Sequence, residues 1–213
     1  MELDLLRKEN EYLAQFINDE RKATLASKLH LRSNFLTVVM ENFYQPHNAS
    51  AVLRTCDCFG VQRAHIVNDT NPFLVQDQVS HGAEKWVEQY EYDSSESCLN
   101  HLKKQGYLIA CTDLDGEDLD LDKFQLTQKT AIVFGTEWTG TSDVAKSMAD
   151  IKLKIPMYGF TQSFNVSVSA AIILHQLNKQ LRHSSHHYNL SELEVETALN
   201  FWYKQLTPVR LDL

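Results

Sequence analysis

The 213-residue chain contains few of the residues that cross-link or interrupt a fold: four cysteines, four prolines and seven glycines. Two of the cysteines, Cys56 and Cys58, are only two positions apart, and no C-x-x-C pair with the spacing of a zinc site occurs. These features exclude a disulfide framework and predict reduced, mostly buried thiols. The chain also lacks an uncharged apolar run of about 18 residues and the apolar centre of a signal peptide. We therefore expect a soluble, cytoplasmic protein.

Three common sequence signatures of ligand binding and catalysis are missing as well. The dinucleotide fingerprint G-x-G-x-x-G and the Walker sequence G-x-x-x-x-G-K-[ST] do not occur, which removes most of the support for a nicotinamide-dependent oxidoreductase or an ATPase. The nucleophile elbow G-x-S-x-G is also missing, so a hydrolase triad has no serine on which to be built.

The charges sum to −8 but are unevenly distributed along the chain. Acidic residues concentrate in DLDGEDLDLD (113–122), which we interpret as a solvated loop because its glycine does not lie where an EF-hand requires it. Residues 151–182 contain lysines and arginines but no acidic residue. The histidines of RHSSHHYN (182–189) have no neighbouring cysteine or carboxylate, so we expect a polar turn there and no metal.

From Phe35 onward, apolar runs rich in β-branched residues alternate with helical patterns. Six runs predict strands, at 35–40, 64–67, 87–92, 107–111, 130–135 and 151–156. Helical patterns follow at 49–59, 94–105, 142–150 and 165–182, with glycine or serine at several of their ends. This alternation predicts an α/β fold in which a mostly parallel sheet is covered by helices on both faces.

Both ends of the chain are predicted to be helical. The first 34 residues have an amphipathic pattern, and a last helix begins near Ser191, which forms a capping box with Glu194. The apolar residues of the last helix need a partner, which is either the N-terminal helix or another subunit. The chain is therefore divided into an N-terminal helical extension (1–34), a central domain (35–182) and a C-terminal helical extension (183–213).

Three polar motifs follow predicted strands, at the edge where open parallel sheets hold ligands. Asn48 precedes Arg54 by six residues, the segment after 130–135 reads G-x-E-x-x-G (Gly135, Glu137 and Gly140), and a third motif extends from Ile155 through QSFNVSVSAA. Taken in this order, over about residues 35–180, the motifs resemble those of the TrmH (SpoU) branch of the SPOUT methyltransferases. Enzymes of this family methylate a ribose 2′-hydroxyl of RNA with S-adenosylmethionine as methyl donor.

The resemblance implies a deep trefoil knot in the C-terminal part of the sheet region and a homodimer whose active sites use both chains. The motifs look most like those of the tRNA guanosine-18 2′-O-methyltransferase group, so the implied partner is tRNA and the implied target lies in its D-loop. Ribosomal RNA is the main alternative substrate. A knotted RNA-binding protein without catalysis is a third interpretation, against which the intact motifs argue.

The resemblance assigns catalysis to Arg54, which in the family is proposed to act as a base. A guanidinium has a pKa above about 12 and remains charged. Our hypothesis is therefore that Arg54 is a fixed cation that positions the ribose phosphate and stabilises the developing alkoxide. The alternative, a surface arginine of an amphipathic helix, is the more common case when only the pattern is considered.

Further site residues are implied by the resemblance, and each has a structural alternative. Capping a helix could be the whole role of Asn48, Ser163 and Asn165, and Glu137 could be a loop carboxylate without a role in the site. Because the family has its active site at the matching positions, the implied catalytic residues are Arg54, Asn48, Glu137, Ser163 and Asn165. Contacts to S-adenosylmethionine are implied for Gly135, Ile155, Pro156, Met157 and Phe164. The aromatic residues Tyr158, Phe160 and Phe164 either stack on bases or form core or pocket walls.

The overall acidity is unusual for a protein that binds RNA, so the RNA contacts are expected from local basic groups. The predicted RNA-binding residues all lie in the N-terminal extension: Arg7, Lys8, Arg21, Lys22, Lys28 and Arg32. Basic residues of the 151–182 region add to this set: Lys152, Lys154, Lys179 and Arg182.

Overall fold

A computed structural model describes residues 2–70, 82–113, 119–136 and 138–207. Within them the chain forms a seven-stranded sheet of order β3-β2-β1-β6-β4-β7-β5, in which all pairs are parallel. The strands are β1 (Leu36–Glu41), β2 (Arg63–Val67), β3 (Glu88–Tyr92), β4 (Leu108–Thr112), β5 (Leu119–Asp120), β6 (Thr130–Phe134) and β7 (Ile151–Lys154). The prediction of a parallel sheet is confirmed, and all six predicted strands are present.

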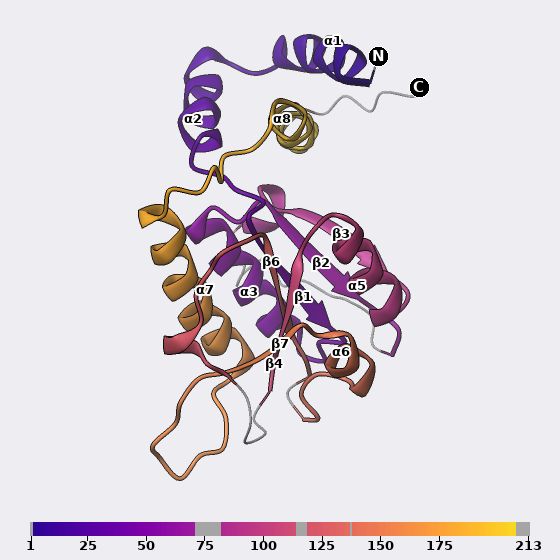
Figure 1. Cartoon of the computed structure of the whole chain (residues 1–213). Helices are drawn as coiled ribbons and strands as arrows, with labels where there is room; N and C mark the ends of the chain where they lie inside the picture. Colours follow the sequence, from indigo (N-terminus) through magenta and orange to yellow (C-terminus); the bar gives the residue numbers. More distant parts are fainter. Residues whose placement is uncertain (1, 71–81, 114–118, 137, 208–213) are drawn as a thin grey trace.

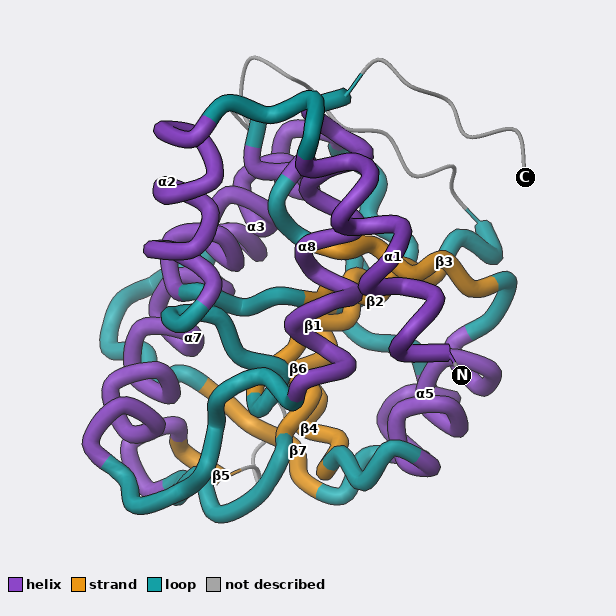
Figure 2. Tube along the Cα trace, turned by 90° about the horizontal axis from the view of Figure 1, so that it is seen from above, coloured by secondary structure: helices purple, strands orange, loops and turns teal. Residues whose placement is uncertain are grey.

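Helices cover both faces of this sheet, as Figures 1 and 2 show: α3 and α7 lie on one side, and α5 and α6 on the other. The helices and 3-10 turns are α1 (Glu2–Ala14), α2 (Asp19–Leu29), α3 (Pro46–Phe59), η1 (Ala83–Lys85), α5 (Ser95–Lys104), η2 (Leu121–Lys123), α6 (Asp143–Met148), α7 (Val166–His183) and α8 (Glu192–Leu206). None of the helices in the described residues is long and apolar enough to cross a membrane.

The core consists of two apolar layers, one on each face of the sheet. Successive side chains of β1 alternate between them: Val38 and Met40 pack with α3 and α7, whereas Val39 packs with α5 and α6. All six residues of β1 are buried. A strand buried on both faces explains why its sequence reads as a continuous apolar run rather than as an alternating pattern.

Several predicted helix ends are confirmed, and one is wrong. The side chains of Ser142, Asn165 and Ser191 cap α6, α7 and α8, and Ser191 forms the predicted capping box. Asn48, in contrast, does not cap α3, because this helix begins one turn earlier with Pro46 at its first position and Gln45 as its N-cap. Proline suits that position because it has no N–H group to leave unpaired.

The N-terminal extension is two helices rather than one, because α2 starts anew at Asn18, whose side chain accepts a hydrogen bond from the Arg21 N–H. Helix α1 packs on α8, and Figure 1 shows α1, α2 and α8 together beyond the amino ends of the strands. Asn10 of α1 joins this helix to α8, because its side chain donates to the Glu196 carbonyl at 2.9 Å and accepts from Asn200 at 3.0 Å. Of the two partners considered for the last helix, the structure thus shows the N-terminal helix. The division of the chain at residues 34 and 182 stays a prediction.

Candidate functional site

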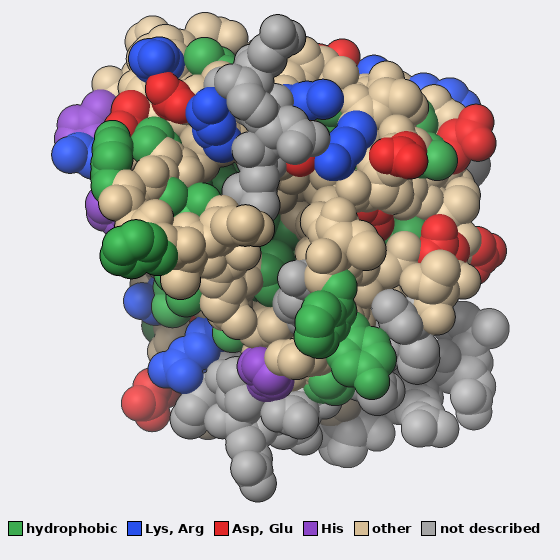
Figure 3. Space-filling model, turned by 90° about the horizontal axis from the view of Figure 1, so that it is seen from below, with side chains coloured by type: hydrophobic (Ala, Val, Ile, Leu, Met, Phe, Trp, Pro, Cys, Tyr) green, Lys and Arg blue, Asp and Glu red, His purple; other side chains and the backbone are tan. Residues whose placement is uncertain are grey.

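A cavity of about 590 Å³ opens at the carboxyl ends of β4, β6 and β7, where the sequence motifs were expected to meet. Figure 3 shows this end of the molecule, on which hydrophobic side chains stand exposed among the loops. The walls come from the last residues of the three strands, from the segments that follow them, and from the start of α7. They combine apolar side chains with polar ones, among them Phe134, Leu153, Ile155, Met157, Phe164, Thr112, Asp113, Ser163 and Ser169.

Gly135, Thr136 and the residues from 138 to 141 lie on one side of this cavity, where the chain turns back on itself. Backbone hydrogen bonds join Thr136 and Gly140 in both directions, at 3.0 and 3.1 Å. A Cβ atom on Gly135 would lie 2.0 Å from the Gly140 carbonyl carbon, so no other residue fits there without moving the backbone. Gly140 has φ of +70°, a conformation that also favours glycine. The loop therefore depends on both glycines of the G-x-E-x-x-G motif, whereas Glu137 lies outside the described residues.

Glu41, the last residue of β1, fixes the helix that follows this loop. Its buried carboxylate accepts hydrogen bonds from the Ser142 N–H at 2.8 Å, the Ser142 hydroxyl at 2.7 Å and the Ser95 hydroxyl. A negative charge at the start of α6 is also favoured by the helix dipole. Glu41 was not singled out from the sequence, where it looks like an ordinary end of a strand.

The amide of Asn165 lies where α3 and α7 begin side by side. Its Nδ2 donates to Oδ1 of Asn48 at 3.1 Å, and its Oδ1 accepts from the Ser167 N–H at 2.9 Å. Asn165 is therefore the cap of α7 and also holds the first turn of α3. Asn48 is 1% exposed and is not among the residues that line the cavity, so its side chain is connected with the cavity wall through its hydrogen bond with Asn165.

Charged groups line the same cavity. The Asp113 carboxylate directly follows β4, is 9% exposed, and lies 3.0 Å from the Lys146 ammonium and 3.9 Å from that of Lys152. Asp113 was interpreted above as part of an acidic loop. Its place two residues after the strand predicted at 107–111 is a signal that could have identified it, because ligands bind at that edge of a parallel sheet.

Six of the expected site residues line the cavity, and three others that the structure describes, Asn48, Pro156 and Arg54, do not. Gly135, Ile155, Met157, Ser163, Phe164 and Asn165 all line the cavity. Pro156 is not among the described lining residues. Arg54 is exposed two turns along α3, outside the cavity lining, and among the described residues its side chain has no hydrogen-bond or ion-pair partner.

The side chains of the predicted RNA-binding residues differ in how exposed they are and in whether a carboxylate of the protein already pairs with them. Lys8, Arg21 and Lys28 are exposed, and Lys22 is paired with Asp19 at 3.4 Å. Arg7 lies 3.7 Å from Glu196 and also pairs with Glu192, so its charge is used between α1 and α8. Arg32 is the least available of the set, because its buried guanidinium binds Asp57 at 2.5 Å and joins the segment after α2 to the end of α3.

The remaining expectations concern cysteines, histidines and aromatic residues. All four thiols are free, and only Cys58 is exposed. No group of three or more histidine, cysteine or acidic side chains that could hold a metal ion occurs in the described part of the chain. Tyr158 and Phe160 are almost fully exposed, at 97% and 109%, and so belong to neither core nor pocket wall.

An all-parallel sheet with a partly apolar cavity at its carboxyl edge, lined by a glycine loop and by the start of a helix, defines the class of α/β proteins that bind a nucleotide-like cofactor at that edge. Comparison with known proteins narrows this class. Residues 35–175 match the sequence model of the SpoU rRNA Methylase family, so the chain belongs to that family.

Individual relatives agree with this assignment. The chain is 39% identical over 194 residues to a tRNA (guanosine(18)-2′-O)-methyltransferase of Borreliella burgdorferi, which covers 91% of this chain and 89% of the relative. It is also similar to the crystal structure of the Aquifex aeolicus TrmH/SpoU tRNA modifying enzyme, with a TM-score of 0.82, 31% identity and coverage of 90% and 98%. A 23S rRNA (guanosine-2′-O-)-methyltransferase of Neisseria meningitidis is 33% identical over 147 residues, 68% of this chain and 58% of that protein.

Proposed function

We propose that this protein transfers a methyl group from S-adenosylmethionine to the ribose 2′-hydroxyl of guanosine 18 in the D-loop of tRNA. The observation that carries the proposal is the cavity at the carboxyl edge, which unites Gly135 of the second motif with Met157 and Asn165 of the third. Asn165 in turn binds Asn48 of the first motif. The similarity to the Borreliella enzyme covers 91% of the chain and so extends beyond residues 35–175, which match the family model. That coverage favours the tRNA target.

The cavity fits S-adenosylmethionine in size and in chemistry. Its volume is within the range of about 300–1,000 Å³ that is common for small-molecule sites. Ile155, Met157 and Phe164 offer apolar surface for a purine, and the Asp113 carboxylate suits ribose hydroxyls or an ammonium group. When bound, the donor supplies a methyl group that is activated by its attachment to a positively charged sulfur. The glycine loop at Gly135 lets the backbone approach the ligand closely.

Arg54 is proposed to act on the RNA rather than on the methyl donor. Its side chain is exposed and has no partner among the described residues, so it is available to a phosphate. A bidentate contact to the phosphate beside the target ribose would fix the hydroxyl and stabilise the negative charge that develops on its oxygen. Asn48 and Asn165 position α3, from which Arg54 projects, through the hydrogen bond between their side chains.

We also propose a homodimer and a trefoil knot, as the resemblance to the family implies. The separation of Arg54 from the cavity within one chain is consistent with a site completed by a second chain. Exposed apolar side chains near the cavity offer surface for that contact: Tyr158, Phe160, Phe164 and Val168. Phe160→Glu should convert a dimer into a monomer in light scattering, whereas Lys104→Glu, a change on α5, should not. A wild-type protein that is monomeric at micromolar concentration would refute the dimer.

Methyl transfer to an unmodified tRNA transcript tests the function. Label from S-adenosylmethionine should appear on the ribose of guanosine 18, as mapped by nuclease digestion, and Arg54→Ala should lower the rate about 10²- to 10³-fold. Arg54→Lys keeps the charge but not the planar fork, so near-normal turnover of this variant would refute the bidentate contact. Lys104→Ala serves as the control.

The free thiols fit a reducing compartment such as the cytoplasm.

Ribosomal RNA is the second candidate substrate, and the similarity to the Neisseria enzyme favours it over other RNAs. Ribosomal RNA fragments should therefore be assayed beside tRNA. Label on the fragments alone would replace the tRNA proposal. Binding of S-adenosylmethionine without transfer to either RNA would indicate an RNA-binding protein that does not catalyse.

A further inference from the structure

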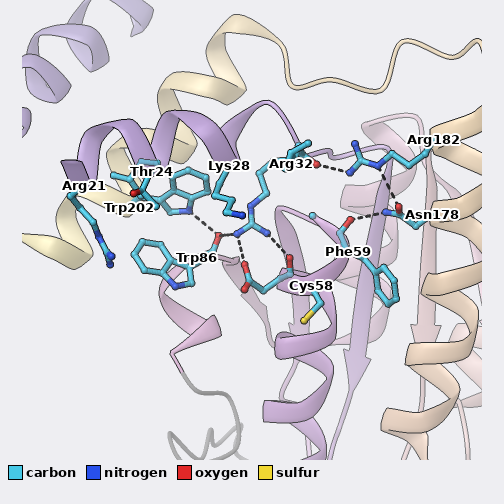
Figure 4. Close-up of a pocket in the computed structure, with 14 residues that line it drawn as sticks. Arg21, Thr24, Lys28, Arg32, Cys58, Phe59, Trp86, Asn178, Arg182 and Trp202 are labelled. Atoms are coloured by element: carbon cyan, nitrogen blue, oxygen red, sulfur yellow. Dashed lines mark hydrogen bonds and ion pairs between the residues drawn. The ribbon is translucent and has the colours of Figure 1, made fainter. Parts of the chain in front are cut away.

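A second cavity, of about 610 Å³, lies at the opposite end of α3 from the first. Figure 4 shows it between α2, the end of α3, α7 and the side chains of Trp86 and Trp202. From Asn48, beside the first cavity, to Asp57, in the second, the helix rises about 14 Å at about 1.5 Å per residue. Nucleotides of one folded RNA could span that distance. The function proposed above makes no use of this cavity.

Its lining is cationic, although the whole chain has a net charge of −8. Among the described residues that line it, four are basic (Arg21, Lys28, Arg32 and Arg182) and one, Asp57, is acidic and paired with Arg32. The guanidinium of Arg182 is also used, because it donates to the Leu31 carbonyl at 2.5 Å. The charge that is available to a ligand therefore comes from Arg21 and Lys28.

Both of these side chains are exposed on α2, and Figure 4 shows them directed from that helix toward the cavity. Within the described ranges, neither side chain has a hydrogen bond or an ion pair to a carboxylate. They are separated by seven residues and therefore lie on the same face of α2, two turns apart. Two cations on one rim, neither bound to a carboxylate of the described residues, favour an anionic ligand.

The floor of the cavity is aromatic and held in place. Trp202 is 1% exposed, and its indole N–H donates to the Trp86 carbonyl at 2.9 Å. The Trp86 ring is half-buried and meets Trp202 edge-on, with 6.1 Å between ring centroids. The Arg21 guanidinium lies 5.3 Å from the Trp86 ring centroid. The partly exposed indole provides a stacking surface for a base, and the neighbouring cations provide partners for its phosphate.

We propose that this cavity binds one unpaired nucleotide of the RNA substrate, at a position other than the methylated ribose. The base stacks on the exposed part of the Trp86 ring, and Arg21 and Lys28 bind the phosphate. The identity of the RNA rests on the function proposed above, whereas the nucleotide chemistry rests on the cavity. A free nucleoside phosphate has the same chemistry as a nucleotide within an RNA chain. The experiment must therefore distinguish a nucleotide of the RNA from a free one.

Cys58 provides a direct probe because it lines this cavity and is exposed. The other three cysteines are buried, and burial raises the pKa of the Cys56, Cys98 and Cys111 thiols to about 12, so they react slowly. The rate of alkylation of Cys58 by iodoacetamide is measured on the full chain alone, with unmodified tRNA transcript, with guanosine monophosphate and with inorganic phosphate. We expect tRNA to slow the reaction at least fivefold and the small molecules to have no such effect at equal phosphate concentration.

A charge reversal separates occupation of the cavity from general coverage by RNA. Lys28→Glu should raise the dissociation constant for tRNA about tenfold, lower the slope of its salt dependence by about one, and abolish protection of Cys58. Lys104→Glu makes the same charge change on α5 and should leave all three quantities at wild-type values. Binding of S-adenosylmethionine should be equal in both variants, which reports that the chain remains folded.

The outcomes also separate this inference from the proposed function. Protection of Cys58 by tRNA without methyl transfer would refute the enzyme and keep the nucleotide cavity. Methyl transfer without protection, or protection by guanosine monophosphate alone, would refute the insertion of an RNA nucleotide. A Lys28→Glu variant that binds tRNA as the Lys104→Glu control does would refute it as well.

Discussion

The side-chain amide of Asn165 donates to the side-chain oxygen of Asn48 at 3.1 Å and so joins two helix starts that are more than a hundred residues apart in the sequence. Both residues belong to motifs that the sequence made conspicuous. The contact gives them a shared role, because Asn165 cannot be replaced without freeing the first turn of the helix that bears Arg54.

Replacing either asparagine should therefore have a coupled effect. Asn48→Ala and Asn165→Ala should each lower the free energy of unfolding by about 1–3 kcal/mol, since each leaves a partly buried polar partner behind. The double variant should cost less than the sum, with a coupling of about 0.5–1.5 kcal/mol in a double-mutant cycle measured by urea denaturation. Gln176 also lies on α7, and its side chain donates a hydrogen bond to the Leu121 carbonyl. Gln176→Ala removes that bond and should show no coupling with Asn48→Ala.

The glycine loop allows a matched pair of substitutions. Gly135→Ala would place Cβ 2.0 Å from the Gly140 backbone, so the loop must shift, and the affinity for S-adenosylmethionine should fall at least 100-fold in calorimetry. In Gly159→Ala the nearest atom would be the Thr161 hydroxyl oxygen at 4.0 Å, so that variant should bind normally. Equal affinities of the two variants would mean that the loop does not form part of the binding site.

The buried carboxylate of Glu41 should be sensitive to the loss of its charge alone. Glu41→Gln keeps the shape but replaces one acceptor oxygen with a donor, which cannot accept from the N–H or hydroxyl of Ser142. We expect a loss of about 2–3 kcal/mol in the free energy of unfolding and weaker binding of S-adenosylmethionine. Glu91→Gln, at an exposed carboxylate that accepts from Asn68, should change stability by less than about 0.5 kcal/mol.

His65 should make the protein sensitive to mild acid. Burial, followed by the nearby charges of His101 and Arg63, lowers the pKa of this imidazole from 6.5 to about 3. Between these values the unfolded chain binds a proton that the folded protein does not. The free energy of unfolding should therefore fall as the pH decreases below about 6.5, by up to about 1.4 kcal/mol per pH unit.

Denaturation curves between pH 7 and pH 5 measure this effect. His65→Gln can keep a hydrogen bond to the Tyr92 hydroxyl, which lies 3.0 Å from Nδ1 in the wild type, and it has no proton to gain. The variant should lose most of the pH dependence in this range, whereas His175→Gln, at an exposed position, should retain it. An unchanged slope in His65→Gln would show that other groups cause the acid sensitivity.

The sequence predicts the parts of the fold that local patterns specify. Strands such as β1 are recognisable because burial on both faces requires a continuous apolar run. The strand β5 was not predicted, since two residues, Leu119 and Asp120, within an acidic stretch give no periodic signal. The start of α3 was placed too late because Asn48 looks like a cap, whereas Pro46 at the first helical position set the actual start.

Long-range contacts explain which features of the site the sequence did not reveal. Arg32 resembles the other basic residues of its segment, and only its contact with Asp57, 25 residues away, shows that its charge is used internally. Asp113 and Glu41 became recognisable as site residues when the cavity and the start of α6 brought their partners together. The glycine, serine and asparagine residues that line the cavity could be singled out beforehand because they belong to sequence motifs.

The contact between α1 and α8 has a consequence for how the ends of the chain can vary. Asn10 and Asn200 are buried against each other, so a truncation at either end leaves a polar, unpaired surface on the other. Trimming the protein from one side only would therefore produce a less stable product than trimming it from both. Insertions and deletions in the two terminal helices should be inherited together, as if the two segments formed one folded unit encoded in two pieces.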